Sequence, residues 1–221
     1  MADTPLPLFP LAHVVLFPCV QTALHLFEPR YRQLARDVMA GERRIGMVAV
    51  PPEHAPAIPG DPPLYSVGCE GHITQCRKRS DGRYDLVLNG ERRFQIDDEV
   101  PYGGTRLYRS ARVTLLEDPY PESARPRVAS CRANILESLG QILERQQPNQ
   151  AQGFPNEQLK RVDDERFVNT LANVFRFPVE EKQLLLETNN ILDRFEVLAG
   201  LLDTWLQNGS GARVPGNRTL H

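Results

Sequence analysis

One stretch of this 221-residue sequence holds side chains that could bind a metal: Cys69, His72 and Cys76. Thiolates and imidazoles are ligands that zinc prefers. On a regular strand Cys69 points to one face and the other two point to the opposite face, so only a bulge, for example at Gly71, would bring them together. Buried thiols acting as small apolar side chains explain the same residues. We therefore expect no metal and no cofactor.

Nucleophilic catalysis requires an exposed hydroxyl or thiol and a base that activates it. Ser210 is the only serine between two glycines, but it lies in a polar tail without the strand, turn and helix that expose a catalytic serine. His13, His25 and His54 have no partner at a spacing that indicates acid–base chemistry. No catalytic residue is predicted, and the protein is not expected to be an enzyme.

An ATP-driven step is also not expected from these residues. A phosphate-binding P-loop requires Gly-Lys followed by Ser or Thr, because the lysine must reach the phosphates from a glycine turn. The three lysines are Lys78, Lys160 and Lys182, and none follows a glycine. A Walker A motif is therefore excluded from the sequence.

The composition is that of a globular protein, with 41% hydrophobic and 24% charged residues. A formal net charge of −2 gives no broad basic surface for nucleic acid. No apolar run approaches the roughly 18 residues of a membrane span, and the first residues lack the features of a signal peptide. The four cysteines are irregularly spaced. We expect a soluble cytoplasmic protein with free thiols and no membrane contact.

Residues 1–120 predict a β-rich lobe with one helix. Four prolines near Leu6–Val20 exclude a helix there and predict edge or bulged strands. A helix is expected to begin at Pro29 and to end at Gly41 in a left-handed conformation. Further strands are predicted at Ile45–Val50, Leu64–Arg77, Arg83–Leu88, Glu91–Ile96 and Arg106–Leu116, with a proline-rich loop over 51–63 and a hairpin turn at Ser80–Gly82.

Residues 121–207 predict a helical lobe, because apolar residues recur at steps of three and four. The first such series is Val128, Cys131, Ile135, Leu139 and Ile142. Further helices are expected over 167–175, from Pro178 onward, and over 191–205. Residues 208–221 are predicted to form a flexible tail. The fold class is therefore α+β.

Three blocks of the sequence resemble the amino-terminal, substrate-binding domain of Lon proteases. They occur in the family's order and together span residues 6–206, nearly the whole chain. The first block comprises Leu6–Leu11, Val14–Pro18 and Leu24–Tyr31; the second, Val67–Gly68 and Asn89–Phe94; the third, Glu180–Glu187 followed by Arg194.

This resemblance implies a β lobe related to PUA-like pseudo-barrels, followed by a helical bundle. It also implies a non-enzymatic role in holding or selecting protein substrates. Nothing in the sequence resembles the ATPase or peptidase modules of Lon, so an ATPase and a peptidase that degrade bound substrates would lie outside this sequence. The expected partners are unfolded or extended polypeptides, with a protease or chaperone as a further partner.

The candidate polypeptide-binding surface comes from the same blocks. Phe27 and Tyr31 are its apolar members, because the first thirty residues concentrate apolar side chains beside proline-bearing strand edges. Glu28, Arg30 and Arg93 are polar members that would line a groove. A structural role is the favoured explanation of these three, since an arginine can pair with the Glu28 carboxylate across the lobe.

Two other functions remain open from the sequence. RNA binding is suggested by the PUA-like resemblance and by the basic runs Arg77–Arg79 and Arg92–Arg93, although the near-neutral charge counts against it. A small-molecule sensor would require an enclosed, polar-lined pocket. The sequence determines neither the bound substrates nor the oligomeric state.

Overall fold

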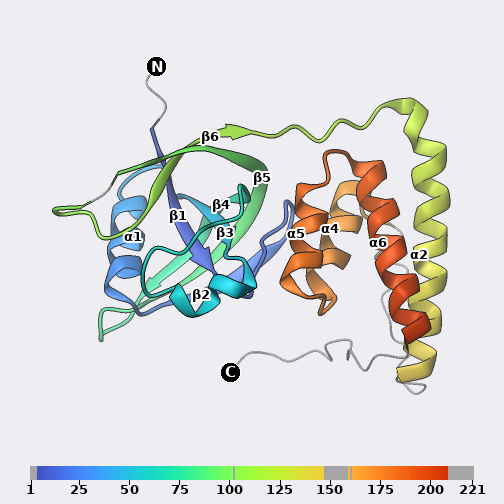
Figure 1. The fold of residues 1–221 in the computed structure, drawn as a ribbon, viewed down its shortest axis with the longest axis horizontal. Coiled ribbons are helices and arrows are strands. Elements are labelled where there is room, and N and C mark those ends of the chain that lie inside the picture. The colour runs from blue at the N-terminus through green and yellow to red at the C-terminus, as the bar shows by residue number, and fades with distance from the viewer. Residues whose placement is uncertain (1–3, 102, 147–158, 160, 209–221) are drawn as a thin grey trace. The chain divides into compact units, whose positions relative to one another are not determined.

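The structure is a computed structural model that describes residues 4–101, 103–146, 159 and 161–208 (Figure 1). Ser210 lies outside the described residues, as does the predicted tail from residue 209 onward. Internal contacts group the chain into two compact units: Met1–Glu117 with Val179–Glu187, and Asp118–Pro178 with Thr188–His221. The fold is α+β, as predicted.

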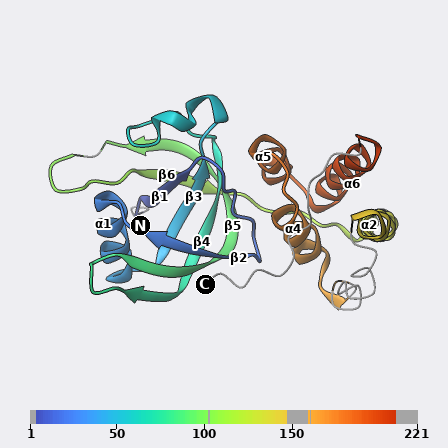
Figure 2. The same cartoon turned by 90° about the horizontal axis from the view of Figure 1, so that it is seen from below.

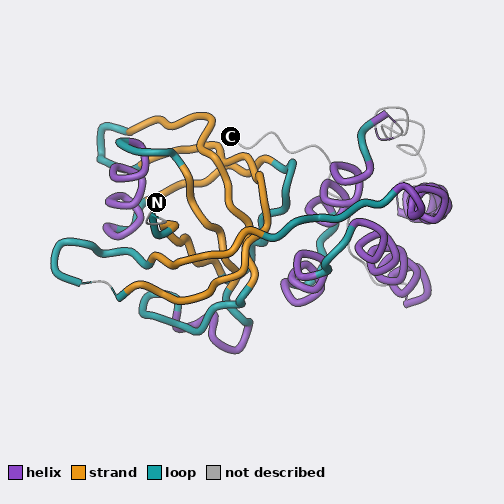
Figure 3. The backbone as a smooth tube through the Cα atoms, turned by 90° about the horizontal axis from the view of Figure 1, so that it is seen from above, coloured by secondary structure: helices purple, strands orange, loops and turns teal. Residues whose placement is uncertain are grey.

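Within the described residues, the first unit contains one six-stranded sheet (Figure 3). Its strands are β1 (Leu6–Leu11), β2 (Gln21–Leu26), β3 (Arg44–Ala49), β4 (Val67–Lys78), β5 (Tyr84–Val100) and β6 (Ser110–Leu115). They follow the order β2-β5-β4-β3-β1-β6, and β5 also pairs with β6. This last pairing joins five strands in a closed circuit and leaves β2 attached through β5. The relation to PUA-like pseudo-barrels stays a prediction.

The expectation of edge or bulged strands was wrong for β1, which pairs with β3 on one side and β6 on the other. Two prolines are tolerated there because of where their nitrogens point. Leu8 N donates to Arg109 O at 2.8 Å, toward β6. Strand alternation points the nitrogen of Pro10 the same way, beyond the two residues that pair with β6. The nitrogen of Pro7 points toward β3, one residue before that ladder begins.

The predicted strands at Arg83–Leu88 and Glu91–Ile96 are parts of a single strand, β5. Its ladder with β4 shifts register between Glu70 and Gly71, where Glu91 is the extra residue on β5. The hairpin between β4 and β5 forms as predicted, with Gly82 at φ 81°. β2 was not predicted as a strand of its own.

Helix α1 (Pro29–Met39) begins with proline at its first position, as predicted. Its buried face contains Tyr31, Leu34, Ala35 and Val38. The end of the helix differs from the expectation for Gly41. Arg43, at φ 58°, adopts the left-handed conformation instead, and its N–H donates to Val38 O at 3.0 Å.

Helix α5 (Val179–Glu187) belongs by its contacts to the first unit. Gln183 Nε2 donates to Val67 O of β4 at 3.0 Å, and Arg93 Nη1 of β5 donates to Leu186 O at 2.8 Å. The predicted boundary near residue 120 stays a prediction. The contacts add a feature that the sequence did not indicate, namely a helix from the carboxyl-terminal part that packs against the sheet.

The second unit contains helices α2 (Arg125–Gln146), α4 (Asp164–Val174) and α6 (Ile191–Asn208) (Figures 1 and 2). The predicted apolar face of α2 is confirmed: Val128, Ile135, Leu139 and Ile142 are buried. Arg194 of α6 is fully buried, and its guanidinium contacts Asp118 Oδ1 at 2.6 Å and Asn169 Oδ1 at 3.0 Å. Loss of this guanidinium would leave a carboxylate without its buried partner, a costly change.

Gly90 allows a close approach that no other residue permits. A Cβ at this position would lie 2.1 Å from Phe17 O, and the backbone of Val20 and Cys19 hydrogen-bonds to Gly90 on either side. We expect Gly90→Ala to lower the free energy of unfolding by about 1–3 kcal/mol, because backbone atoms must move apart. Urea unfolding followed by circular dichroism measures the change.

Gly41→Ala is the matched control in the same unit. A Cβ there meets only carbonyl oxygens at 3.9 Å, so its effect should stay within about 0.5 kcal/mol. Equal effects of the two substitutions would contradict the steric explanation.

Candidate functional site

β2 offers a strand edge that the described sheet does not use. Its six residues pair with β5 from Gln21 opposite Asn89 to Leu26 opposite Tyr84 (Figure 2). Among the described strands, β2 pairs with β5 and with no other. Alternate N–H and C=O groups of an edge strand point away from its neighbour. We call this outward side of Gln21–Leu26 the β2 edge.

An apolar side chain stands at the end of the β2 edge. Phe27 is 58% exposed, and its ring stacks on His25 with centroids 6.2 Å apart. His25 Nδ1 lies 2.7 Å from Asp85 Oδ1, and Arg79 Nε donates to Asp85 Oδ2 at 2.6 Å. Asp85 thus fixes the imidazole against which the phenyl ring rests. The hydrogen bond from Arg79, and then that to His25, holds the pKa of Asp85 below its usual range.

Among the described residues, Glu28 pairs with Arg30, two positions along the chain, and not with an arginine from across the lobe. Arg30 Nε donates to Glu28 Oε2 at 2.9 Å, and its guanidinium lies 4.5 Å from the centre of the Tyr31 ring. The same guanidinium donates to Ile58 O at 2.7 Å and to Gly60 O at 3.3 Å. Arg30 therefore fastens the proline-rich loop to the start of α1, next to Phe27.

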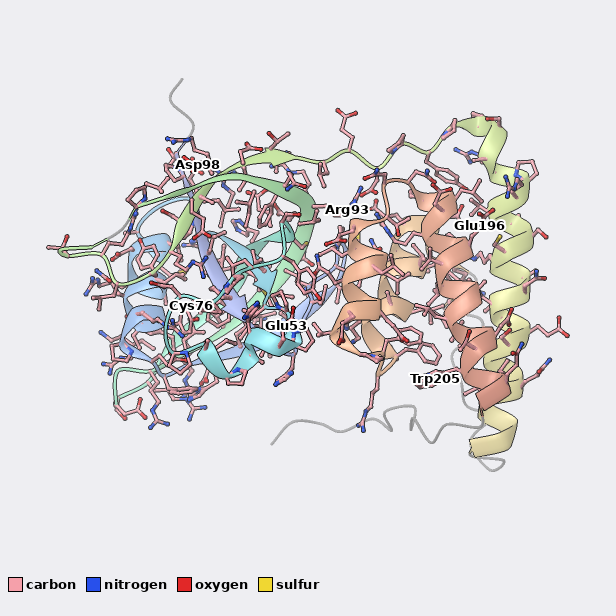
Figure 4. The ribbon with its side chains drawn as sticks, in the orientation of Figure 1. Glu53, Cys76, Arg93, Asp98, Glu196 and Trp205 are labelled. Atoms are coloured by element: carbon pink, nitrogen blue, oxygen red, sulfur yellow. The ribbon has the colours of Figure 1, made fainter. Side chains whose placement is uncertain are left out.

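Tyr31 and Arg93, the other two predicted site residues, lie in the interior. Tyr31 is 4% exposed; its ring contacts Phe9 edge-on at 4.4 Å, and its hydroxyl donates to Pro10 O at 3.3 Å. Arg93 is 1% exposed and reaches Leu186 O (Figure 4). Both are conspicuous in sequence because the core requires them, and we exclude them from the proposed surface.

Cys69, His72 and Cys76 do not form a metal site: across the described parts of the chain, no three His, Cys, Asp or Glu side chains are placed to hold one. Cys69 is fully buried, and its thiol donates to Glu70 O at 3.5 Å. Burial raises the pKa of the Cys76 thiol. A thiol of raised pKa is protonated at neutral pH and is a poor nucleophile.

One buried carboxylate of the sheet, that of Glu70, was not singled out from the sequence. Glu70 on β4 is 1% exposed and lies between two arginines of the neighbouring strands. Arg44 Nη1 is 2.7 Å from one of its oxygens, and Arg92 Nη2 is 3.2 Å from the other. The only sequence signal was an acidic residue within an apolar strand.

A model of the family described as the ATP-dependent protease La (LON) substrate-binding domain matches residues 5–204. The chain belongs to this family. It is 26% identical over 205 residues to a Lon protease of Cytophaga hutchinsonii and 27% identical over 205 residues to one of Xanthomonas oryzae pv. oryzae. These alignments cover 91% and 90% of this chain, but 24% and 23% of those relatives. This Lon-family chain therefore spans about a quarter of their length.

Solved structures support the fold. The N-terminal domain of a Lon protease from the Mycobacterium avium complex superposes with a TM-score of 0.66 at 18% identity, covering 90% of this chain and 98% of that one. A Lon N-terminal domain protein from Xanthomonas campestris gives 0.60 at 23% identity, covering 89% and 98%. The family model confirms the resemblance recognised in the sequence, and these structures confirm the fold.

The Lon-like blocks coincide with the features described above. The segment Leu24–Tyr31 joins the end of β2 to the start of α1 and contains Phe27, and Asn89–Phe94 supplies Gly90 and Arg93.

No helix in the described residues combines the length and the apolar composition of a membrane span.

The pKa of Asp85 provides a test of the geometry at the β2 edge. Arg79→Gln removes the strongest partner of the carboxylate, so we expect the Asp85 pKa to rise toward its ordinary value. Carbon-detected NMR titration of the side-chain carboxyl measures it. Because the folded pKa is lowered, the stability that this pair contributes is present above the unfolded pKa and is lost as pH falls through the folded one.

Arg83→Gln is the control, since Arg83 pairs with Asp81 rather than Asp85. An Asp85 titration that Arg79→Gln leaves unchanged would show that the His25–Asp85–Arg79 arrangement does not persist in solution.

Proposed function

We propose that this Lon-family chain is a non-catalytic module that binds extended or unfolded polypeptide by adding it as a strand to the β2 edge. The unused edge is the observation that carries the proposal. Main-chain hydrogen bonds recognise any extended peptide, whatever its sequence, and neighbouring side chains add preference. At ~3.3 Å per residue, an edge as long as β2 accommodates about six residues of ligand.

Phe27 supplies the apolar part of this recognition. An exposed phenylalanine beside an open edge offers a surface for the apolar side chains that unfolded proteins expose. The family description as a substrate-binding domain supports the same role. Bound polypeptide would pass to a protease or chaperone, because the sequence contains no P-loop to drive its degradation.

Polypeptide fits the charge distribution better than RNA does. In the β4–β5 connection Arg79 pairs with Asp85, and on the sheet Arg92 pairs with Glu70 and Arg112 with Asp98. Arg93, which belonged to the second basic run, is buried. Cations held by carboxylates release fewer counterions when they meet a phosphate backbone. The four free thiols fit a reducing compartment such as the cytoplasm.

Strand addition depends on the backbone of the ligand. An extended peptide methylated on alternate backbone nitrogens keeps the donors of one edge, whereas a peptide methylated on consecutive nitrogens loses the donors of both edges. We expect the alternately methylated peptide to bind nearly as well as the unmethylated one, and the consecutively methylated peptide to bind about tenfold or more weakly. Fluorescence anisotropy measures both. Equal binding by all three peptides would rule out strand addition.

The apolar contact depends on Phe27. We expect Phe27→Ser to weaken binding of an extended peptide about tenfold, because the variant loses an apolar contact at the interface. The melting temperature should change little, since the side chain is mostly exposed.

Leu184→Ser is the matched control, because Leu184 on α5 is also an exposed apolar residue, at 51%. Its peptide affinity should equal that of the unchanged protein. A similar loss in both variants would point to non-specific apolar adhesion rather than to the β2 edge.

A further inference from the structure

A basic cavity of about 410 Å³ lies beside the carboxyl-terminal end of β2, and no role has been assigned to it. One face of α1 forms one wall, the β4–β5 hairpin forms another, and the connection to β6 contributes the rest. Its lining residues are Pro29, Arg32, Gln33, Arg36, Lys78, Gly82, Tyr84 and Leu107. All of them belong to the first unit.

The lining contains three cations and no acidic residue. Arg36 is partly neutralised, because its Nε donates to Asp37 Oδ1 at 3.1 Å. Within the described part of the chain, neither Arg32 nor Lys78 has a carboxylate partner. Lys78 Nζ instead lies 5.9 Å from the centre of the Tyr84 ring. Two cations that face one cavity without counter-charges favour an anionic ligand.

Two sets of contacts hold parts of the cavity lining in place. The Arg32 guanidinium rests on Gly82, where a Cβ would come within 2.2 Å of Nη2. Gln33 holds the opposite wall, since its Nε2 donates to Thr105 O at 2.5 Å and its Oε1 accepts from Leu107 N at 2.7 Å. These bonds keep Leu107, 49% exposed, as an apolar wall beside the cations.

The strand ladders place this cavity at the carboxyl-terminal end of β2. Leu26 at the end of β2 pairs with Tyr84, and Tyr84 pairs with Lys78. Phe27 precedes Pro29, a lining residue, by two positions. Because β2 and β5 separate the open edge from β4, a strand added to that edge lies roughly 14 Å from Lys78. A ligand reaches the cavity only where its chain continues past Leu26 by about four residues and turns around the end of β2.

We propose that the cavity binds a carboxylate of the polypeptide held on the β2 edge, so that the module prefers segments with an acidic side chain or a free carboxyl terminus at that end. This inference rests on the proposed function and adds a substrate class to it. Arg32 and Lys78 bind the carboxylate, and Leu107 and the Tyr84 ring contact the apolar part of the same or the adjacent residue.

The test uses the full chain and four versions of one labelled β-forming peptide, with Glu or Gln near the end and with a free or an amidated carboxyl terminus. Anisotropy is measured at about 50 mM and about 300 mM salt, because exposed ion pairs weaken with screening. We expect at least one carboxylate-bearing version to bind about tenfold more tightly than the Gln amide at low salt. Which version gains most distinguishes a side chain from a chain terminus.

Protein variants locate the effect. Arg32→Gln with Lys78→Gln should abolish the preference for carboxylate and leave binding of the Gln amide unchanged. The matched control, Arg77→Gln with Arg166→Gln, removes the same charge from exposed residues outside the cavity and should retain the preference.

The peptide measurements distinguish a failure of the carboxylate site from a failure of the proposed polypeptide-binding function. Equal binding of all four peptides, with dependence on Phe27 preserved, would overturn the carboxylate site alone. Absence of binding by every version would overturn the proposed function as well. If a short single-stranded oligonucleotide binds in a way that depends on Arg32 and Lys78 while no carboxylate-bearing peptide gains affinity, the cavity is a phosphate site and the carboxylate proposal is wrong.

Discussion

The pairing of β5 with three neighbours is the constraint on which the first unit depends. This 17-residue strand pairs with β4 along most of its length, with β2 over Tyr84–Asn89 and with β6 over Phe94–Val100. Because β6 also pairs with β1, each of the other described strands has a partner on both sides over part of its length. Among the described strands, β2 therefore has an open edge along its whole length, because it pairs with β5 on one side only.

Natural sheets usually protect such an edge with charges, prolines or bulges, because it can pair with other chains. β2 contains Gln21, Thr22, Ala23 and Leu24 before His25, with neither proline nor a formally charged residue among its first four positions. The stability of a sheet of this size does not require an unprotected edge. An unprotected edge beside the exposed Phe27 is the arrangement that strand addition requires.

The sequence predicted the α+β class, the start of α1, the β4–β5 hairpin and the apolar face of α2, since each of these depends on local signals. It failed where distant residues decide the outcome. β1 is an internal strand despite its prolines, because their nitrogens point where no partner is needed. β2 was missed because a half-exposed strand of polar and small residues lacks a clear apolar alternation. The place of α5 depends on hydrogen bonds from Arg93 and Gln183, to which no spacing along the chain points.

The same distinction applies to the candidate site. Family-like motifs combine residues that build the core with residues that face solvent, and sequence alone does not separate them. Tyr31 and Arg93 belong to the first kind because they hydrogen-bond to buried carbonyl groups, whereas Phe27 belongs to the second. Arg32 and Lys78 lie 46 positions apart in the sequence. They line the same cavity because α1 lies beside the β4–β5 hairpin.

Recognition through backbone hydrogen bonds alone would be indiscriminate, since every extended segment presents the same groups. A module that must choose among unfolded chains therefore needs a second contact that depends on side chains but does not require one sequence. An apolar ring at one point and a cationic cavity at the end of the same strand meet this requirement. Each adds a small free energy that only some segments obtain, and specificity is the difference between those sums. With the proposed function, the arrangement at the end of β2 would allow broad binding and selection to coexist in one small sheet.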